Sequence, residues 1–424
     1  MPTLNKIRSV LAGATRPGGP GDAASPRPGL RRLRIAITVF FALDGFVFAG
    51  WVVRIPDIKT QTGASPGALG LALLGVSAGG VVTMMLTGRL CHRFGNHAVT
   101  VASGALFSIG AALPPLTHSA LSLGLVLLVF GAAYGGLNVA MNAAAVDLIA
   151  ALGRPVMPGF HAAFSLGGMA GAGVGGLVAG QLTPARHLLL LTVCGLLVTA
   201  LAGRVLLTGR APLGKAPAPA SARPEAGTSD GSPARTGRTS GQRRLVLVLG
   251  LVALCTAYGE GALADWSALH LTEDLGAGPG TAAAGYSVFA LAMTAGRLCG
   301  TWMLERLGRT RLLTAGGLTA GAGMLLGALA PQVPLVLTGF LITGLGLANL
   351  FPVAVARAGA VAGPGGVAAA STLGYGGMLI GPVAIGFLAE WFSLTAALTT
   401  VALLAAVAAV VARFAGTTAD AGDE

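Results

Sequence analysis

Two acidic residues interrupt apolar stretches of the chain in matching contexts. Asp44 lies in "LDGFVFAGWVVR" and Glu260 lies in "GEGALADWSALH"; each precedes a glycine and is followed six or seven residues later by a tryptophan. A charged side chain at the centre of a bilayer costs about 2.5 to 3.5 kcal/mol on insertion scales, so both carboxyl groups must face the protein interior or a cavity. A carboxyl group in a low-dielectric cavity holds its proton more tightly than in water, which suits it to load and release protons near neutral pH. The pair predicts proton coupling, led by Asp44; the alternative is that each carboxyl only bridges helices.

Polar and aromatic residues in the same kind of stretch are candidates for contacting a solute. Small-molecule sites combine a few polar groups with aromatic walls, and Asn138 and Asn142 lie one turn apart on one helical face. Polar residues in membrane helices also join helices, in bonds worth about 0.6 to 2 kcal/mol, and this alternative stays open. The predicted substrate-binding residues are Asn138, Asn142, His161, Asn349, Trp51, Trp266, Tyr258 and Tyr375, with Asp265 as a weaker candidate.

The elements that carry these residues belong to a membrane protein. Of 424 residues, 54% are hydrophobic and 10% are charged, and the mean hydropathy is +0.77. Long Ala, Leu, Val and Gly runs of about 20 residues indicate spanning helices rather than the alternating ten-residue segments of a β-barrel. We expect an all-α membrane protein with twelve transmembrane helices, at residues 35–56, 67–90, 98–116, 121–151, 160–184, 188–208, 245–270, 280–303, 311–330, 334–358, 367–391 and 394–414.

The distribution of basic residues predicts how the chain lies in the membrane. The net charge is +12, but Lys and Arg gather in the N-terminal tail and in alternate loops rather than on one face, which argues against a nucleic-acid partner. Basic loops stay on the cytoplasmic side, so both termini are predicted to be cytoplasmic in a bacterial plasma membrane. We expect a monomer in the lipid bilayer.

The chain divides into two similar halves. We expect a disordered tail (1–34), a six-helix bundle (35–208), a cytoplasmic linker (209–243), a second bundle (244–414) and a C-terminal tail (415–424). The linker is rich in Pro, Ala, Ser and Gly. Besides the two acidic segments, "GRLCHRFG" pairs with "TWMLERLG", "GGLN" with "GLAN", and "GGM" with "GGM". The two halves therefore predict two pseudo-symmetric six-helix bundles with a site between them near the midplane.

This organisation resembles the major facilitator superfamily over about residues 31 to 414. The segments "RIPDIK", "NVAMNAAAVDL", "RPVMPGFHAAFSLGG" and "GEGALADWSALHL" resemble its MosC-like branch, which is related to the fucose permease group. The resemblance implies a secondary-active transporter that works by alternating access. By analogy with this branch, its solute is expected to be small, polar and sugar-like or inositol-like.

The resemblance also implies a cytoplasmic gate. "GRLCHRFGNH" resembles the superfamily's loop motif, in which an acidic residue and an arginine latch two helices, but His92 stands at the acidic position. The second copy keeps Glu305 and Arg306. Arg297 lies in "MTAGRLCG" near the cytoplasmic end of a span, where it is expected to pair with Asp147 or Glu305 or to extend to water. The predicted gating residues are Arg93, Asp147, Arg297, Glu305 and Arg306.

A further arginine, Arg54, follows Asp44 by about two and a half turns. We expect it near the extracellular surface, with its stem reaching water in an ordered outer loop beside Asp57 and Lys59.

The predicted function is transport of a small polar solute, driven by the proton gradient and using no cofactor or metal. The enzyme-like patterns "GVSAG" and "GRAPLGKA" lie in a span or lack the Ser or Thr that would hold magnesium, so we do not expect an enzyme. Two alternatives remain: an exporter of a drug-like molecule or metabolite that exchanges it for protons, and a membrane sensor that does not transport.

Overall fold

The computed structural model describes residues 28–153, 156–208 and 240–420, and within these ranges it contains helices and no strand. Most of the predicted linker and of the predicted N-terminal tail lies outside the described residues, as do residues 421–424. The predicted C-terminal tail begins inside a helix, because α14 continues to Asp420. The long helices are α2 (Pro28–Val52), α4 (Pro66–Phe94), α5 (Asn96–Gly110), α6 (Ala120–Leu152), α7 (Met157–Ala179), α8 (Pro184–Thr208), α9 (Ser240–Leu269), α10 (Pro279–Leu298), α11 (Gly300–Leu329), α12 (Val333–Leu347), α13 (Leu350–Trp391) and α14 (Leu394–Asp420). Three short helical segments join them: α3 (Ile55–Thr62), η1 (Pro114–Leu116) and the π-helical turn η2 (His270–Asp274).

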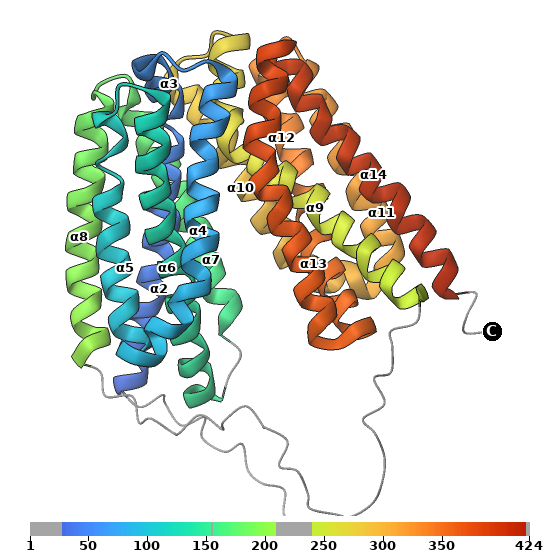
Figure 1. Ribbon diagram of the computed structural model, residues 1–424, viewed down its shortest axis with the longest axis horizontal. Coiled ribbons are helices and arrows are strands. Elements are labelled where there is room, and N and C mark those ends of the chain that lie inside the picture. The colour runs from blue at the N-terminus through green and yellow to red at the C-terminus, as the bar shows by residue number, and fades with distance from the viewer. Residues whose placement is uncertain (1–27, 154–155, 209–239, 421–424) are drawn as a thin grey trace, which may run out of the picture.

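The helices form two bundles, and these are built to the same plan. Helices α2 to α8 form one half and α9 to α14 the other (Figure 1). In the first half, α2 packs on α7 and α8, and α6 packs on α4 and α5. In the second half, α9 packs on α13 and α14, and α12 packs on α10 and α11. Since corresponding helices make corresponding contacts, the two bundles are the repeat that the sequence predicts.

Eleven helical segments among the described residues are long and apolar enough to cross a membrane. The predicted eighth span, α10, is not one of them, although it packs beside α7 and α12 like the others. Its sequence mixes apolar residues with Gly, Ser, Thr, Tyr and Arg, and several of these side chains line the cavity described below. The chain is thus an all-α membrane protein of two six-helix bundles, in which one helix is less apolar because it faces that cavity.

Glycines allow the closest helix contacts. A Cβ atom at Gly167 or Gly171 of α7 would collide with the backbone of α2, and one at Gly377 of α13 would collide with the backbone of α9. Glycines spaced by four residues lie on one face of a helix and have no side chain there. The backbone of a second helix can therefore contact that face directly. Close contacts at glycines therefore join α2 to α7 in the first half and α9 to α13 in the second half.

Several helix limits differ from the predicted spans. Helix α2 begins at Pro28, before the predicted start at residue 35, and α9 begins at Ser240, inside the predicted linker. The predicted span 334–358 is broken, because α12 ends at Leu347 and α13 begins at Leu350. Helix α13 itself is interrupted at Gly363, which has a φ of 60°.

The two halves meet mainly at the end of the molecule that carries α3. There the start of α4 packs on the end of α13, and the end of α7 packs on the start of α10. Toward the other end, where α8 ends and α9 begins, the ribbons of the two halves diverge (Figure 1). We refer to the first as the α3 end and to the second as the linker end.

Candidate functional site

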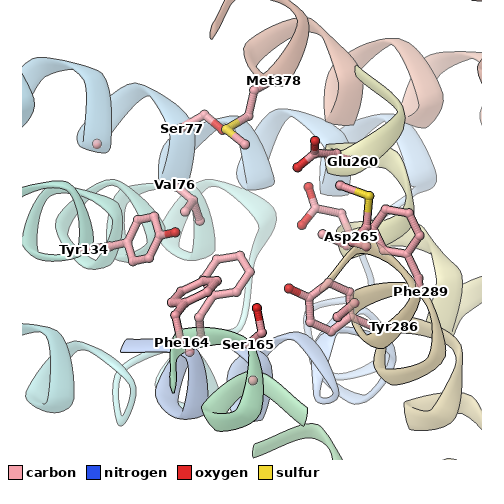
Figure 2. A pocket seen from close by; sticks show the side chains of 18 of the residues that line it. Val76, Ser77, Tyr134, Phe164, Ser165, Glu260, Asp265, Tyr286, Phe289 and Met378 are labelled. Carbon is pink, nitrogen blue, oxygen red and sulfur yellow. The ribbon is translucent and has the colours of Figure 1, made fainter. Parts of the chain in front are cut away.

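A cavity of about 250 Å³ lies between the two halves. Both halves contribute to its wall, through α2, α4, α6 and α7 on one side and α9, α10 and α13 on the other. Figure 2 shows Tyr134, Phe164 and Ser165 facing Glu260, Asp265 and Tyr286 across it. The wall is mostly apolar and aromatic with a few convergent polar groups, which is the composition expected of a small-molecule site.

Glu260 lines this cavity and is held by an arginine. Arg297 of α10 uses Nη2 to bind both carboxylate oxygens of Glu260, at 3.0 and 3.1 Å. Arg297 also lines the cavity, and its Nε donates to the carbonyl oxygen of Ala348 at 3.4 Å. The partner of Arg297 in this structure is therefore Glu260, rather than the predicted Asp147 or Glu305. Glu260 and Arg297 are neighbours because α9 and α10 pack side by side. The sequence alone does not specify which helices pack together.

Asp44 lies behind the cavity wall rather than on it. Its side chain is fully buried, and no described residue makes a hydrogen bond to either carboxyl oxygen. The next residue, Gly45, lines the cavity. Asn138 and Tyr134 of α6 lie close enough to act on the Asp44 carboxyl electrostatically. A buried carboxyl without a partner is costly unless it binds a proton or a charge from elsewhere, so its position suits a proton-binding group.

Asp265 and Tyr286 complete the polar part of the wall. Asp265 lies on α9, five residues after Glu260, and its carboxylate points into the cavity (Figure 2). Tyr286 of α10 lies within electrostatic reach of Glu260, Asp265, Arg297 and Asp44. Its hydroxyl lies in the cavity wall and can donate a hydrogen bond to a carboxylate or to a solute.

Of the predicted substrate-binding residues, Tyr375 lines the cavity and Asn138 lies beside Asp44. The structure places four others in contacts outside the cavity lining. The ring of Trp51 packs on Phe130, Trp266 is buried, the Tyr258 hydroxyl bonds to that of Thr400, and Asn349 Nδ2 donates to the Gly296 carbonyl oxygen.

The remaining two predicted substrate-binding residues lie toward the linker end. Asn142 Nδ2 donates to the backbone oxygen of Asn138 at 2.8 Å, one turn away on α6. His161 is exposed, and its ring meets Phe41 edge-on. Neither belongs to the lining of the cavity in this conformation.

The predicted gating residues, Arg297 apart, lie near the linker end without joining the two halves. Asp147 accepts a hydrogen bond from Asn96 within its own half. Arg93 and Arg306 are exposed and lie against the rings of Phe94 and Trp302, their own helical neighbours. Glu305 is exposed on α11.

Arg54 is buried, so the prediction that it reaches water is wrong. Its guanidinium donates to His187 Nδ1 at 2.9 Å and to Asp57 at 2.8 Å. It also donates to the carbonyl oxygens of Ala179 and Leu182, at 3.2 and 3.1 Å. These acceptors come from the end of α7 and the start of α8, which close over the arginine. The predicted association with Asp57 in an ordered segment is present, since Asp57 lies in α3.

The sequence reading missed most of the cavity wall. Of the aromatic residues there, Phe48, Tyr134, Phe164, Tyr286 and Phe289 were not singled out. A signal existed for Tyr134, which lies one helical turn before Asn138 and so on the same face of α6. No comparable signal marks the phenylalanines, because an aromatic residue in an apolar helix has the same pattern whether it faces a cavity, a neighbour or lipid.

Comparison of the sequence with known proteins gives related transporters. The Major Facilitator Superfamily profile matches residues 35–259 and 249–422. An uncharacterized MFS-type transporter of Yersinia pestis is 34% identical over 391 residues, which cover 91% of this chain and 96% of the relative. The membrane protein MosC of Rhizobium meliloti is 28% identical and covers 93% of each chain.

Solved structures share the fold at low sequence identity. A bacterial homologue of the human lysosomal transporter Spinster, in an inward-facing and occupied conformation, superposes with a TM-score of 0.71 at 15% identity, over 93% of this chain and 98% of that one. The nucleoside transporter NupG gives 0.66 at 14% identity, over 92% and 99%. A D-xylose-proton symporter gives 0.64 at 14% identity, over 90% and 97%.

Proposed function

Because this chain belongs to the major facilitator superfamily and is a transporter rather than an enzyme, we propose that it moves a small polar solute by alternating access coupled to protons. The observation that carries the proposal is the cavity between the halves, with Glu260 and Asp265 in its wall and Asp44 buried just behind it. The proton gradient is the energy source.

The proton step is assigned to Asp44 and Glu260. Asp44 is buried beside the uncharged amide of Asn138 and forms no salt bridge among the described residues, so a proton is the simplest way to remove its charge. Glu260 is neutralised instead by Arg297. A proton on Glu260 would release Arg297, and a proton leaving Asp44 would create a charge beside Tyr134, so each event changes the wall that the solute contacts.

Alternating access is supported by the uneven contacts between the halves. At the α3 end, Lys59 pairs with Glu273, and Glu390 of α13 binds Ser65 and the backbone of Gly67. At the linker end, Arg93, Glu305 and Arg306 are exposed. With the linker end in the cytoplasm, this is a state closed to the outside. Transport then requires that the contacts at the α3 end break while residues such as Glu305 and Arg306 close the other end.

The cavity size favours a small solute. Its volume of about 250 Å³ lies below the range of roughly 300 to 1,000 Å³ usual for pockets that hold drug-sized ligands. The D-xylose-proton symporter and the nucleoside transporter NupG, which share the fold, are named for solutes of modest size. We therefore favour uptake of a small polar solute over export of a drug-like molecule, by a monomer in the bacterial plasma membrane with both termini in the cytoplasm.

Accumulation of radiolabelled solutes in reconstituted vesicles tests this proposal. Candidate solutes are chosen by the rise in unfolding temperature that they cause in the purified protein. Uptake should follow the direction of an imposed pH gradient and should be abolished in Asp44→Asn and in Glu260→Gln. Accumulation only when the gradient is reversed would identify an exporter, and unchanged uptake in both variants would remove the proton assignment.

A further inference from the structure

The charges in the cavity wall do not balance. Arg297 Nη2 donates to both carboxylate oxygens of Glu260, and the two charges cancel each other. Asp265 also lines the cavity, and no described residue donates a hydrogen bond to it or forms a salt bridge with it. As a carboxylate, Asp265 therefore leaves the wall with one uncompensated negative charge.

Aromatic rings surround this unpaired carboxylate. Tyr286 and Phe289 come from α10 on the same side as Asp265, and Phe48, Tyr134 and Phe164 lie across the cavity. The face of an aromatic ring carries partial negative charge and attracts cations, most strongly where water is excluded. Figure 2 shows the Tyr286 hydroxyl directed into the cavity, where its oxygen adds a further acceptor.

We propose that the solute is a small organic ammonium ion whose positive charge pairs with Asp265. This rests on the proposed transport function and specifies its substrate class. A neutral polyol could donate hydrogen bonds to Asp265, but it would leave the negative charge unbalanced as the halves close. An ammonium group supplies both the hydrogen bonds and the charge, and its carbon skeleton packs against the rings of Phe164 and Phe289.

Matched pairs of probes separate the charge from the shape of the ligand. Each pair differs only in an ammonium group replaced by a hydroxyl: benzylammonium with benzyl alcohol, and 4-aminocyclohexanol, protonated at neutral pH, with 1,4-cyclohexanediol. Binding is measured on the purified full-length protein by the rise in unfolding temperature over a concentration series, which yields an apparent Kd. The proteins compared are the parent, Asp265→Asn, Asp265→Glu and Asp420→Asn. Asp420 is the last residue of α14 and does not line the cavity, so its amide variant controls for the loss of one charge.

We expect the ammonium member of at least one pair to bind ten times more tightly than its alcohol. This preference should disappear in Asp265→Asn, persist in part in Asp265→Glu, and be unchanged in Asp420→Asn. Equal or tighter binding of the alcohols overturns the proposal, as does a preference that survives Asp265→Asn or an absence of binding by both pairs.

Failure of this inference and failure of the proposed function give different results. If a neutral solute binds and is moved across vesicle membranes in response to a pH gradient, transport stands and the ammonium proposal falls. If the ammonium probe binds through Asp265 but no solute crosses under a gradient of either sign, the binding site stands and the transport proposal falls.

Discussion

Replacing Glu390 with alanine is expected to loosen the contact between the two halves at the α3 end. The Oε2 atom of Glu390, at the end of α13, accepts a hydrogen bond from Ser65 Oγ at 2.9 Å and another from the backbone N of Gly67 at 2.9 Å. Ser65 and Gly67 begin α4, where the unpaired backbone N–H groups carry partial positive charge. One carboxylate therefore joins the second half of the protein to the first turn of a helix in the other half.

The size of the effect follows from the number of bonds and their exposure. A hydrogen bond to a charged group contributes about 1.5 to 3 kcal/mol when well shielded, and exposed ionic contacts contribute about 0 to 1 kcal/mol. Because Glu390 is an exposed residue, we take about 0.5 kcal/mol for each of its two bonds, or about 1 kcal/mol together. Loss of about 1 kcal/mol changes an equilibrium about fivefold, here toward the state that is open at the α3 end.

The assay is the labelling rate of a buried reporter cysteine. Ala283 of α10 is buried against α7 at the α3 end, so the variant Ala283→Cys in a protein without its native cysteines should react only when the halves separate. A membrane-impermeant thiol reagent should label it about five times faster with Glu390→Ala. A double-mutant cycle with Ser65→Ala isolates the contact between the two side chains.

Ser393→Ala is the matched control. Ser393 Oγ accepts a hydrogen bond from the backbone N of Ala396 within the second half, so its loss weakens the start of α14 without touching α4. The labelling rate of this variant should equal that of the parent. Equal rates for the parent and Glu390→Ala would refute the reasoning, because Glu390 would then not hold the two halves together.

Three further results are expected. Glu260→Gln and Arg297→Gln should each lower transport at least tenfold, as measured by vesicle uptake. A variant in which the two residues are exchanged should recover part of the transport. No recovery would mean that the pair does more than neutralise charge. Gly171→Val should lower the unfolding temperature by several degrees, at a cost of about 1 to 3 kcal/mol, since its side chain would collide with the backbone of α2; an unchanged temperature would contradict the packing. Arg54→Met should destabilise the protein by about 3 to 5 kcal/mol in chemical unfolding, because His187 and the buried carbonyl groups lose their donor, and a stable variant would show that water replaces the guanidinium.

The fold could be predicted because its signals are local and repeated. Long apolar runs define the helices, and the duplication of the acidic segments defines two halves. Boundaries were less predictable, since the first turns of α2 and α9 are polar and basic and read as tail and linker. The break between α12 and α13 does have a signal, because Pro352 lacks the N–H that would bond the carbonyl oxygen of Ala348.

The candidate site could be predicted only in part, because it depends on how helices rotate about their axes. The duplicated acids identified α2 and α9 as helices near the cavity, but their equivalence in sequence does not give equivalent positions. Asp44 is covered by neighbours, whereas Glu260 reaches the cavity and Arg297. Trp51 and Trp266 turn into their own bundles and pack there. The acidic residue and tryptophan in each half thus predicted correctly which helix lies beside the cavity. They predicted incorrectly that the tryptophan lines it.

The central claim, that solute movement is coupled to protons through this cavity, is tested most directly with a pH electrode. A solute that stabilises the purified protein is pulsed into a weakly buffered suspension of vesicles that contain it, without an imposed gradient. We predict that the external medium becomes alkaline as solute and protons enter together, and that Asp44→Asn removes the signal while the solute still binds. No pH change with the parent protein, despite entry of the solute, would contradict the account.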